Sequence, residues 1–358
     1  MNARPAIHQL LPALHPGDAV GNEAMSLRAH LRRAGFESDI FAAWADPRVA
    51  DVAGTLRECR GAATAGSVLL FHFGCGSPAG PLALEVPARL ALMYHNITPA
   101  HFFDPFAPGL ARELRFGRRE LARLASRTSV ALAKSSFSRR ELVELGFEPT
   151  GIVPYALSPG LYRGTPSRVV RRLFPADRKN VLVVGRVAPN KKIEDALRAF
   201  SVYQKEMERR SRLLIVGETR GSDAYVHSLL HLTRDLGLRD VVFTGHVTQE
   251  DLLGYYAVAD VMLSLSEHEG YGVPLVEAMI LGVPVVAFDA GAVSETLGGS
   301  GVLLREKSAD LVATVIDSLD RDPSLRAGVL ARQRGVAETL LAVDPGALLL
   351  ESLQPLLG

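Results

Sequence analysis

Two carboxylates, Glu269 and Glu277, lie in a stretch whose pattern predicts a binding site at the end of a strand. Residues 264–287 read SLSEHEGYGVPLVEAMILGVPVVA, and the apolar run that leads into them, 259–264, predicts a buried parallel strand. Glycines then let the chain turn, and Pro274 fits the first position of a helix. The free backbone N–H groups at a helix start point outward and can seat a phosphate. The stretch therefore predicts a phosphate seat bracketed by two acids, one suited to a sugar ring and one to ribose hydroxyls.

The same residues resemble those of a known family. Glu269 and Glu277, with seven residues between them, reproduce the E-x7-E signature of the retaining glycosyltransferases of family 4. Two acids at this spacing are common in ordinary loops, so the resemblance depends on the surrounding letters, including the Glu-Gly-aromatic-Gly-x-Pro core. It implies an α/β protein of the GT-B fold, with two Rossmann-like doubly wound parallel-sheet domains facing across a cleft. It also implies that Glu269 faces the transferred sugar and that the donor nucleotide contacts Gly272, Val273, Leu275 and Glu277.

Two cations follow another predicted strand. Residues 181–185 read VLVVG, and Arg186 and Lys191 come after them. A leaving nucleoside diphosphate gains negative charge as the glycosidic bond breaks, so fixed cations there stabilise the transition state more than the ground state. The family resemblance places a Gly-Arg and a Lys in these roles. The alternative, two solvated cations at a helix start, is disfavoured by the helix dipole. With both cations on the phosphates we predict no metal and no other cofactor.

Two further strand ends, Gly217-Glu218 and Gly245-His246-Val247, are predicted at the same edge of this sheet. The resemblance implies that the two loops flank the nucleotide base, with Glu218 in the first and the backbone at Val247 in the second. When a loop binds a base through its backbone, the side chains of the loop do not indicate which base is bound. Uracil and guanine are therefore not distinguished, and we interpret His246 as a plain loop residue.

The first half of the chain carries candidates for the acceptor side. His95 follows a predicted strand and opens the string His-Asn-Ile-Thr-Pro, which resembles a bacterial subset of the family. The resemblance implies that His95 contacts the donor sugar near the reacting centre, and the alternative is a histidine that caps a strand end. His72 and Ser77 belong to a similar strand-end loop, and we assign them to the acceptor pocket.

The loop after the first predicted strand, 17–22, reads GDAVGN and lacks the dinucleotide fingerprint G-x-G-x-x-G. It also departs from the commoner family pattern, in which adjacent glycines approach the donor diphosphate. We expect Gly21 to make the backbone approach, and Asp18 or Asn22 to hydrogen-bond the acceptor or the donor. Alternatively, Asn22 caps the helix that is predicted over 23–36.

Apolar runs such as 68–73 alternate with helical patterns along the whole chain, which predicts parallel sheets with helices on both faces. A Pro- and Gly-rich stretch, 154–166, separates two such series. We therefore predict an acceptor-binding domain over 1–160 and a donor-binding domain over 161–341. A last helix, 342–358, is expected to cross back to the first domain. Ligands of such domains bind at the carboxyl ends of the strands.

The composition excludes several classes of protein. The 358 residues are 47% hydrophobic and 22% charged, with a net charge of +1, which is typical of a globular protein and excludes a nucleic-acid binder. The two cysteines support neither a disulfide framework nor a metal site. No apolar run reaches the roughly 18 residues of a membrane span, and the first residues lack the apolar core of a signal peptide. We therefore expect a cytoplasmic protein.

One surface feature suggests a membrane. Arginines recur on a single face of the helix predicted over 108–127, opposite leucines. A solvated face is one interpretation. The other is peripheral contact with anionic lipid headgroups or a lipid-diphosphate acceptor. The arginines are Arg112, Arg115, Arg119, Arg123 and Arg127.

These patterns and the resemblance predict a retaining glycosyltransferase that moves a sugar from a UDP- or GDP-linked donor to an acceptor hydroxyl. We expect a glycan or glycolipid acceptor in bacterial envelope polysaccharide biosynthesis. The alternatives are a transferase acting on a small natural product, a nucleotide-sugar epimerase on the same fold, and a non-catalytic nucleotide-sugar-binding protein. The pattern does not indicate an oligomeric state.

Overall fold

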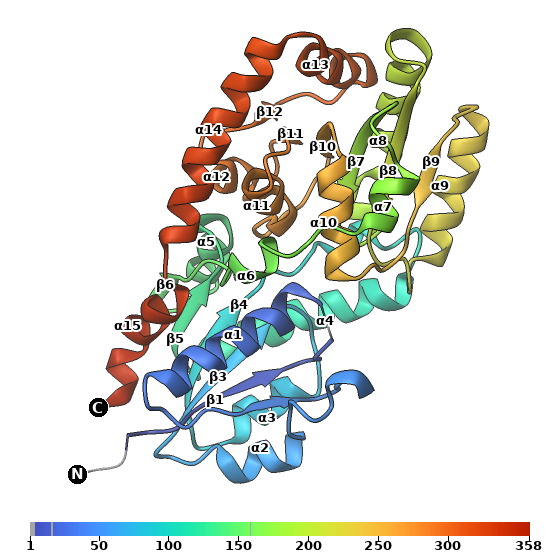
Figure 1. Cartoon of the computed structure of the whole chain (residues 1–358). Helices are drawn as coiled ribbons and strands as arrows, with labels where there is room; N and C mark the ends of the chain where they lie inside the picture. Colours follow the sequence, from blue (N-terminus) through green and yellow to red (C-terminus); the bar gives the residue numbers. More distant parts are fainter. Residues whose placement is uncertain (1–3, 16, 158) are drawn as a thin grey trace. The chain divides into compact units, whose positions relative to one another are not determined.

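The computed structural model describes residues 4–15, 17–157 and 159–358. Pro16, directly before the predicted loop 17–22, and Ser158, in the predicted linker, lie outside this range. The chain groups into two compact units, each built on one six-stranded sheet (Figure 1). The first unit contains the residues up to Ala100, those from Gly109 to the linker, and Val343–Gly358. The second contains His101–Pro108 and Pro159–Ala342. The segment His101–Pro108, which we predicted in the first domain, therefore belongs with the second unit.

The first sheet is wholly parallel, with the strand order β2-β1-β3-β4-β5-β6. Its order reverses between β1 and β3, so the chain leaves these two strands toward opposite sides of the sheet. Open sheets of this kind bind ligands beside the carboxyl ends of the strands at such a point. The strands are β1 Ile7–Leu11, β2 Ile40–Ala42, β3 Val68–Phe73, β4 Arg89–Tyr94, β5 Thr128–Ala133 and β6 Thr150–Ile152.

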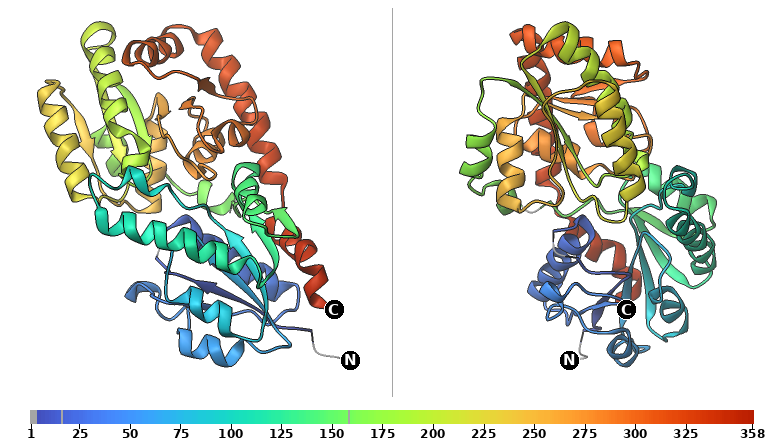
Figure 2. Two further views of the ribbon diagram at one scale, coloured as in Figure 1. Left: turned by 180° about the vertical axis from the view of Figure 1, so that it is seen from behind. Right: turned by 90° about the vertical axis from the view of Figure 1, so that its right-hand side faces the viewer.

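Helices cover both faces of this sheet (Figure 2, right). On one face, α1 and the last helix of the chain, α15, pack against β1, β3, β4 and β5, and Leu27, Leu31, Leu349 and Leu353 are buried there. The helices of the unit are α1 Ala19–Arg33, α2 Leu56–Ala62, α3 Ala79–Glu85, α4 Pro108–Leu124, α5 Ser136–Glu144 and α15 Pro345–Leu357.

The second sheet is also wholly parallel, with the order β12-β11-β10-β7-β8-β9. Its order reverses between β7 and β10, which are hydrogen-bonded neighbours although three helices and two strands separate them in the chain. The strands are β7 Lys179–Val184, β8 Ser211–Val216, β9 Val241–Phe243, β10 Val261–Ser264, β11 Val285–Phe288 and β12 Val302–Leu304.

The core of the second unit lies where α8, α9 and α13 pack on β7, β8 and β10, with Phe200, Tyr225 and Ile316 among its buried side chains. The helices of this unit are α6 Pro159–Tyr162, α7 Arg168–Leu173, α8 Ile193–Val202, α9 Asp223–Asp235, α10 Gln249–Val258, α11 Val273–Ile280, α12 Val293–Leu297, α13 Ala309–Arg321 and α14 Pro323–Ala342.

Three helix starts differ from those predicted, each because of a cap. Helix α1 begins at Ala19 instead of Glu23, since Asp18 accepts a hydrogen bond from the N–H of Gly21 and is the N-cap. For helix α5 the sequence favours Ser136 as the cap, whereas in the structure Ser135 is the N-cap. Helix α11 has Gly272 as its N-cap and Val273 first, so Pro274 occupies the second helical position. Pro274 is tolerated there because the early N–H groups have no partner within the helix.

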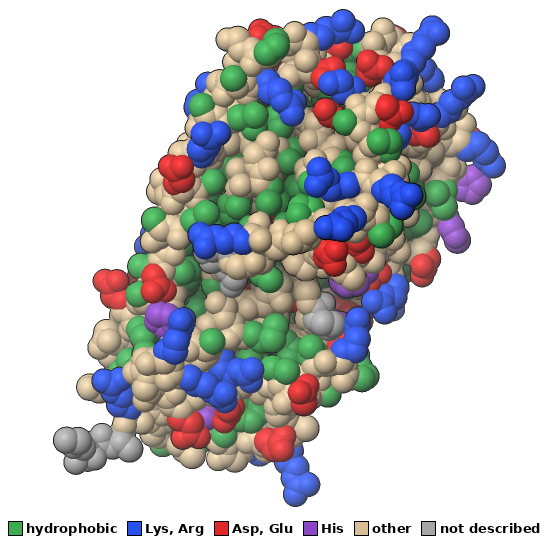
Figure 3. Space-filling view, in the orientation of Figure 1, with side chains coloured by type: hydrophobic (Ala, Val, Ile, Leu, Met, Phe, Trp, Pro, Cys, Tyr) green, Lys and Arg blue, Asp and Glu red, His purple; other side chains and the backbone are tan. Residues whose placement is uncertain are grey.

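Acidic and basic side chains are interspersed over the face seen in Figure 3, as the net charge of +1 would suggest. Among the described residues, no single helix is both long and apolar enough to cross a membrane, and only α14 and α15 taken together have the length and composition.

Candidate active site

The carboxyl ends of β7 and β10, at the reversal point of the second sheet, bring two predicted residues together. Lys191 follows β7 in a short turn, Pro189–Lys191, and Glu269 lies in the loop after β10. The Lys191 Nζ atom lies 2.6 Å from Glu269 Oε1, and both side chains are mostly buried. A cation and an acid from separate loops therefore meet at the strand edge where open α/β sheets bind ligands.

Two hydrogen bonds between the loops position this pair. The backbone N–H of Glu267 donates to the Asn190 carbonyl at 2.9 Å, and the side-chain amide of Asn190 donates to the carbonyl of His268 at 3.2 Å. The two loops are thus joined directly beside Lys191 and Glu269. Rigid support of this kind is what a site needs if its charges are to act without reorganising.

The third loop that supports the pair follows β11. The Ala292 N–H donates to the Glu269 carbonyl at 2.9 Å. Gly291 has a φ of +63°, and a Cβ atom there would lie only 2.3 Å from the Glu269 carbonyl oxygen. Gly291 is therefore a glycine for two reasons, a left-handed backbone and the close approach of Glu269.

Helix α11 begins beside this loop without a side-chain cap. Gly272 has a φ of +93° and turns the chain into the helix, and the Leu275 N–H donates to the Gly272 carbonyl. Leu275 is buried, whereas Val273 remains partly exposed. The helix start thus retains the uncapped geometry that the phosphate prediction requires, and that assignment stays a prediction.

Glu277, one turn further along α11, is partnered by a tyrosine from α10. The Tyr256 hydroxyl lies 2.9 Å from Glu277 Oε2 and donates to it. Burial raises the pKa of Glu277 to about 7, and the hydrogen bond from Tyr256 opposes that rise. A carboxyl that is half protonated near neutral pH is poised to change state when a polar ligand replaces its surroundings.

Arg186 and Glu218 lie in adjacent loops after β7 and β8. The Val187 N–H donates to the Glu218 carbonyl at 2.9 Å, and the exposed Arg186 guanidinium donates to the carbonyl of Arg220 at 3.2 Å. Glu218 itself pairs with Arg220, and this hydrogen-bonded contact lowers the pKa of Glu218 to about 2. Arg220 escaped the sequence analysis because it lies beyond the strand-end glycine, in a segment without a motif.

Val247, the other predicted base contact, is partly exposed in the loop between β9 and α10, directly before the cap of α10 at Thr248. The structure thus places Lys191 and Glu269 in contact, Glu277 on the adjoining helix, and Arg186 with Glu218 on the neighbouring loops.

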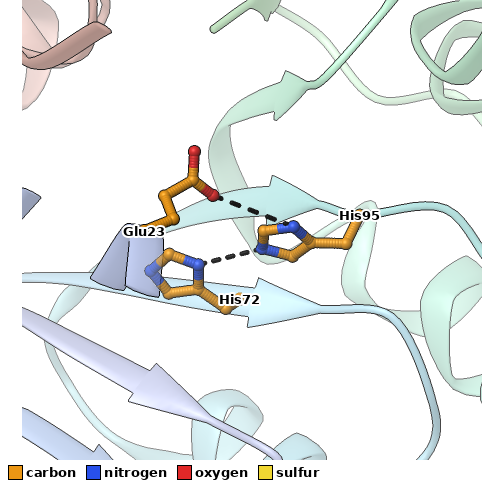
Figure 4. A group of neighbouring side chains, drawn as sticks. All are labelled: Glu23, His72 and His95. Atoms are coloured by element: carbon orange, nitrogen blue, oxygen red, sulfur yellow. Dashed lines mark hydrogen bonds and ion pairs between the residues drawn. The ribbon is translucent and has the colours of Figure 1, made fainter. Parts of the chain in front are cut away.

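In the first unit, His95 lies at the carboxyl end of β4 among buried polar side chains (Figure 4). Its Nε2 atom lies 2.9 Å from Nδ1 of His72, and its Nδ1 atom lies 3.0 Å from the Tyr155 hydroxyl. Glu23 Oε2 is 3.9 Å from the same Nδ1, and Glu23 Oε1 contacts Lys134 Nζ at 2.6 Å. Strand β3, helix α1 and the loops after β4, β5 and β6 therefore all contribute to one polar cluster.

The structure corrects the assignment of His72 to the lining of an acceptor pocket. His72 is fully buried in β3, with its two ring nitrogens bonded to Gln9 and His95. Ser77 has a structural role in the described contacts: its N–H donates to Glu120 and its hydroxyl accepts from the Ala79 N–H at the start of α3.

The loop before α1 also differs from expectation. Asp18, the cap of α1, holds the Gly21 N–H at 2.5 Å. Gly21 is buried in the first helical turn, and a Cβ atom there would lie 2.8 Å from the His15 carbonyl oxygen. Asn22 lies within the helix, which overturns its interpretation as the cap.

Gln9, Glu23, Lys134 and Tyr155 were missed by the sequence analysis. Lys134 directly follows a strand, where the rule of strand ends could have found it, whereas Tyr155 lies in the predicted stretch between the two domains. Gln9 and Glu23 offer no such signal, because they are polar residues inside an apolar strand and an amphipathic helix.

Among the described residues, one group of side chains has the spacing of metal ligands: Glu23, His72 and His95. The ammonium group of Lys134 contacts the carboxylate of Glu23, and Gln9 already binds one nitrogen of His72. A metal ion there would face a neighbouring cation in a buried place, so the donor set does not suit one.

One family model matches a range that lies within the second unit. Residues 169–333 match the family model described as Glycosyl transferases group 1. This range contains both loops of the Lys191–Glu269 pair and the whole of α11.

Two curated relatives are similar to parts of this chain. The D-inositol 3-phosphate glycosyltransferase of Kineococcus radiotolerans is 32% identical over 56% of this chain and 51% of its own length. A GDP-mannose-dependent alpha-(1-6)-phosphatidylinositol monomannoside mannosyltransferase of Mycobacterium tuberculosis is 28% identical over 71% of this chain and 69% of its own. The match therefore spans about half the length of the first of these relatives.

Among solved structures, the sucrose-phosphate synthase of Thermosynechococcus elongatus superposes with a TM-score of 0.77. The alignment covers 98% of each chain at 20% identity, which shows a common fold. The protein thus has the GT-B fold, in which each of two doubly wound parallel sheets forms the centre of one unit.

Proposed function

We propose that this protein is a retaining glycosyltransferase that moves a sugar from a UDP- or GDP-linked donor to an acceptor hydroxyl. The single observation that carries the proposal is the contact between Lys191 and Glu269 at the reversal point of the second sheet. It lies beside the uncapped start of α11, within the range that matches the glycosyltransferase model.

Each side chain then has a role that follows from its charge. Lys191 and Arg186 bind the diphosphate, whose negative charge grows as it leaves. Glu277 accepts hydrogen bonds from the ribose hydroxyls, as a carboxylate can. When the diphosphate binds the ammonium group of Lys191, the ion pair with Glu269 opens and Glu269 can face the sugar. Its negative charge then stabilises the positive charge that develops at the anomeric carbon.

The proposed reaction keeps the configuration of the anomeric carbon. The bond from this carbon to the β-phosphate oxygen breaks, and the acceptor oxygen attacks from the same face. The departing phosphate oxygen takes the acceptor proton, so neither a separate base nor a metal ion is needed. Fixed cations favour this course because they hold the leaving group close to the acceptor.

For the acceptor, we propose a glycan or glycolipid of a bacterial envelope. The Mycobacterium tuberculosis relative is named for a phosphatidylinositol mannoside, and four of the five arginines of the predicted stripe, together with Phe116, are exposed on α4. The fifth, Arg127, instead donates to the carbonyls of Val86 and Ala88. An exposed row of cations with one aromatic side chain suits the surface of an anionic membrane, where the protein would work on the cytoplasmic side.

The test is to incubate the protein with UDP-, GDP- and ADP-linked sugars and to follow nucleotide release and the fate of the sugar. Slow nucleotide release, accelerated by an acceptor, is the expected result. Interconversion of the sugar would identify an epimerase, and saturable binding without turnover a binding protein; either result would refute the proposal.

Variants locate the activity. Lys191→Met should weaken nucleoside diphosphate binding roughly 10- to 100-fold, the range for loss of a charge-assisted hydrogen bond. Glu269→Gln should retain nucleotide binding and lose transfer. The matched control is Lys179→Met, because Lys179 also forms an ion pair, at the opposite end of the same strand. Equal effects of the two lysine variants would contradict the site assignment.

A further inference from the structure

A continuous row of hydrogen bonds runs through the interior of the first unit and ends on His95. It connects the backbone carbonyl of Ala24 to Gln9, Gln9 to His72, His72 to His95, and His95 to the Tyr155 hydroxyl. Each member comes from a different strand, helix or loop. The direction of every bond in this row follows from one fixed point, the carbonyl.

The first two bonds fix the proton on His72. A carbonyl oxygen only accepts, so the Gln9 nitrogen must be the atom that lies 3.0 Å from the Ala24 oxygen. The Gln9 oxygen then lies 2.9 Å from Nε2 of His72, and this ring nitrogen must carry the hydrogen. Gln9 and His72 are both fully buried, so water cannot replace either partner in these hydrogen bonds.

The next bonds fix the proton on His95. A neutral His72 with its hydrogen on Nε2 offers a lone pair at Nδ1, so Nε2 of His95, 2.9 Å away, donates. The Tyr155 hydroxyl, 3.0 Å from the other nitrogen of His95, then donates in turn.

Both rings are neutral because of what surrounds them. Glu23 and Lys134 lie beside His95 in contact with each other and together contribute no net charge, so an imidazolium here would be an uncompensated buried charge. Burial, and then the charge of Lys134, lower the pKa of His72 to about 3 and that of His95 well below its ordinary value.

We propose that Gln9 and His72 are positioning residues that hold His95 with its hydrogen on Nε2, so that its Nδ1 accepts a hydrogen bond from a hydroxyl of the sugar substrate. Tyr155 holds the place of that hydroxyl until the substrate arrives. This inference rests on the proposed function for the substrate, whereas the arrangement of protons is a property of the free protein. His95 is then a neutral acceptor that orients a sugar.

The first test is nitrogen NMR of the histidine rings in the free, full-length protein. We expect His95 to carry its hydrogen on Nε2 from pH 5.5 to 8.5. Gln9→Met removes the amide, so His95 should show a mixture of the two tautomers. The matched control is Gln333→Met, since Gln333 is an equally buried glutamine that bonds backbone groups in the second unit. A hydrogen on Nδ1 of His95 in the unaltered protein, or an unchanged ring in Gln9→Met, would overturn the proposal.

A conservative variant gives the second test. The carboxyl introduced by Gln9→Glu copies the amide while protonated, donating to Ala24 and accepting from His72. When this carboxyl ionises, its proton goes to solvent, and the carboxylate still accepts the Nε2 hydrogen of His72. Nδ1 of His72 keeps its lone pair, so His95 should keep its hydrogen on Nε2 in Gln9→Glu, unlike in Gln9→Met. Transfer by Gln9→Glu should therefore exceed transfer by Gln9→Met, and an equal loss in the two variants would contradict the positioning role.

Kinetics and metal binding complete the test. Tyr155→Phe should lower the KM for the sugar donor or the acceptor and leave kcat unchanged, since the place-holding hydroxyl is gone; a fall in kcat would overturn that role. Stoichiometric zinc binding that His72→Ala abolishes would show a metal site and refute the proposed arrangement of protons. If no nucleotide sugar is turned over, the proposed function fails while the NMR result still decides the tautomer.

Discussion

Glu277 should make donor binding depend on pH. Its pKa near 7 in the free protein arises from burial, with only the Tyr256 hydroxyl to offset the loss of water. Ribose offers two hydroxyl donors, which an ionised carboxylate accepts and a protonated one accepts only in part. Binding should therefore select the ionised form, lower the pKa of Glu277 and release a proton.

The size of the effect follows from the protonated fraction. Below pH 7 the ionised fraction falls about tenfold with each pH unit, and the apparent Kd rises by the same factor. Donor binding at pH 5 should thus be roughly 100-fold weaker than at pH 8. At pH 7, binding should release about half a proton for each donor molecule.

Calorimetry with a UDP- or GDP-linked sugar, and without acceptor, measures both quantities. A sugar-linked diphosphate has no terminal phosphate that titrates near neutrality, so the protein supplies the proton. Repeating the titration in buffers of different ionisation enthalpy counts the protons released. In Glu277→Gln the pH dependence should vanish. A Kd that stays constant from pH 5 to 8, or a slope that persists in this variant, would refute the reasoning.

Three further predictions concern stability and surface binding. Lys134→Met leaves the Glu23 carboxyl buried without its partner, which should lower the free energy of unfolding by about 3–5 kcal/mol, and adding Glu23→Leu should recover much of the loss in denaturant titrations. Gly291→Ala should lose transfer and destabilise the second unit, because its Cβ atom would push against the Glu269 carbonyl; near-normal thermal unfolding and turnover would contradict this. Finally, flotation should show binding to vesicles with anionic lipid and no binding to vesicles without it. The bound fraction should fall when the exposed arginines of α4 are changed to glutamine, namely Arg112, Arg115, Arg119 and Arg123. Equal recovery on both kinds of vesicle would exclude binding to an anionic lipid surface.

Residues at strand ends can be located from the sequence for a physical reason. Near-continuous apolar runs identify buried parallel strands, and their carboxyl ends must meet at one edge of a sheet. Lys191 and Glu269 could therefore be assigned to neighbouring loops although 78 positions separate them, and the structure places them in contact.

Contacts made from the middle of elements could not be predicted in the same way. Tyr256 reaches Glu277 from inside α10, and Gln9 reaches His72 from inside β1, where no turn or glycine marks either residue. Their partners depend on how two elements pack against each other, and this packing cannot be inferred from a single sequence. The assignment of His72 failed similarly, because alternation along a strand does not reveal which polar side chain faces a filled interior.

The two units are not two consecutive pieces of chain. The terminal helix α15 supplies Leu349, Leu353 and Leu356 to the core of the first unit, and His101–Pro108 leaves that unit to join the second. A fragment that stops at residue 160 would expose the apolar patch that α15 normally covers, and the complementary fragment would carry that helix with nothing to cover. Neither half can be expected to fold independently, and one face of the first sheet stays partly uncovered until α15 has been synthesised.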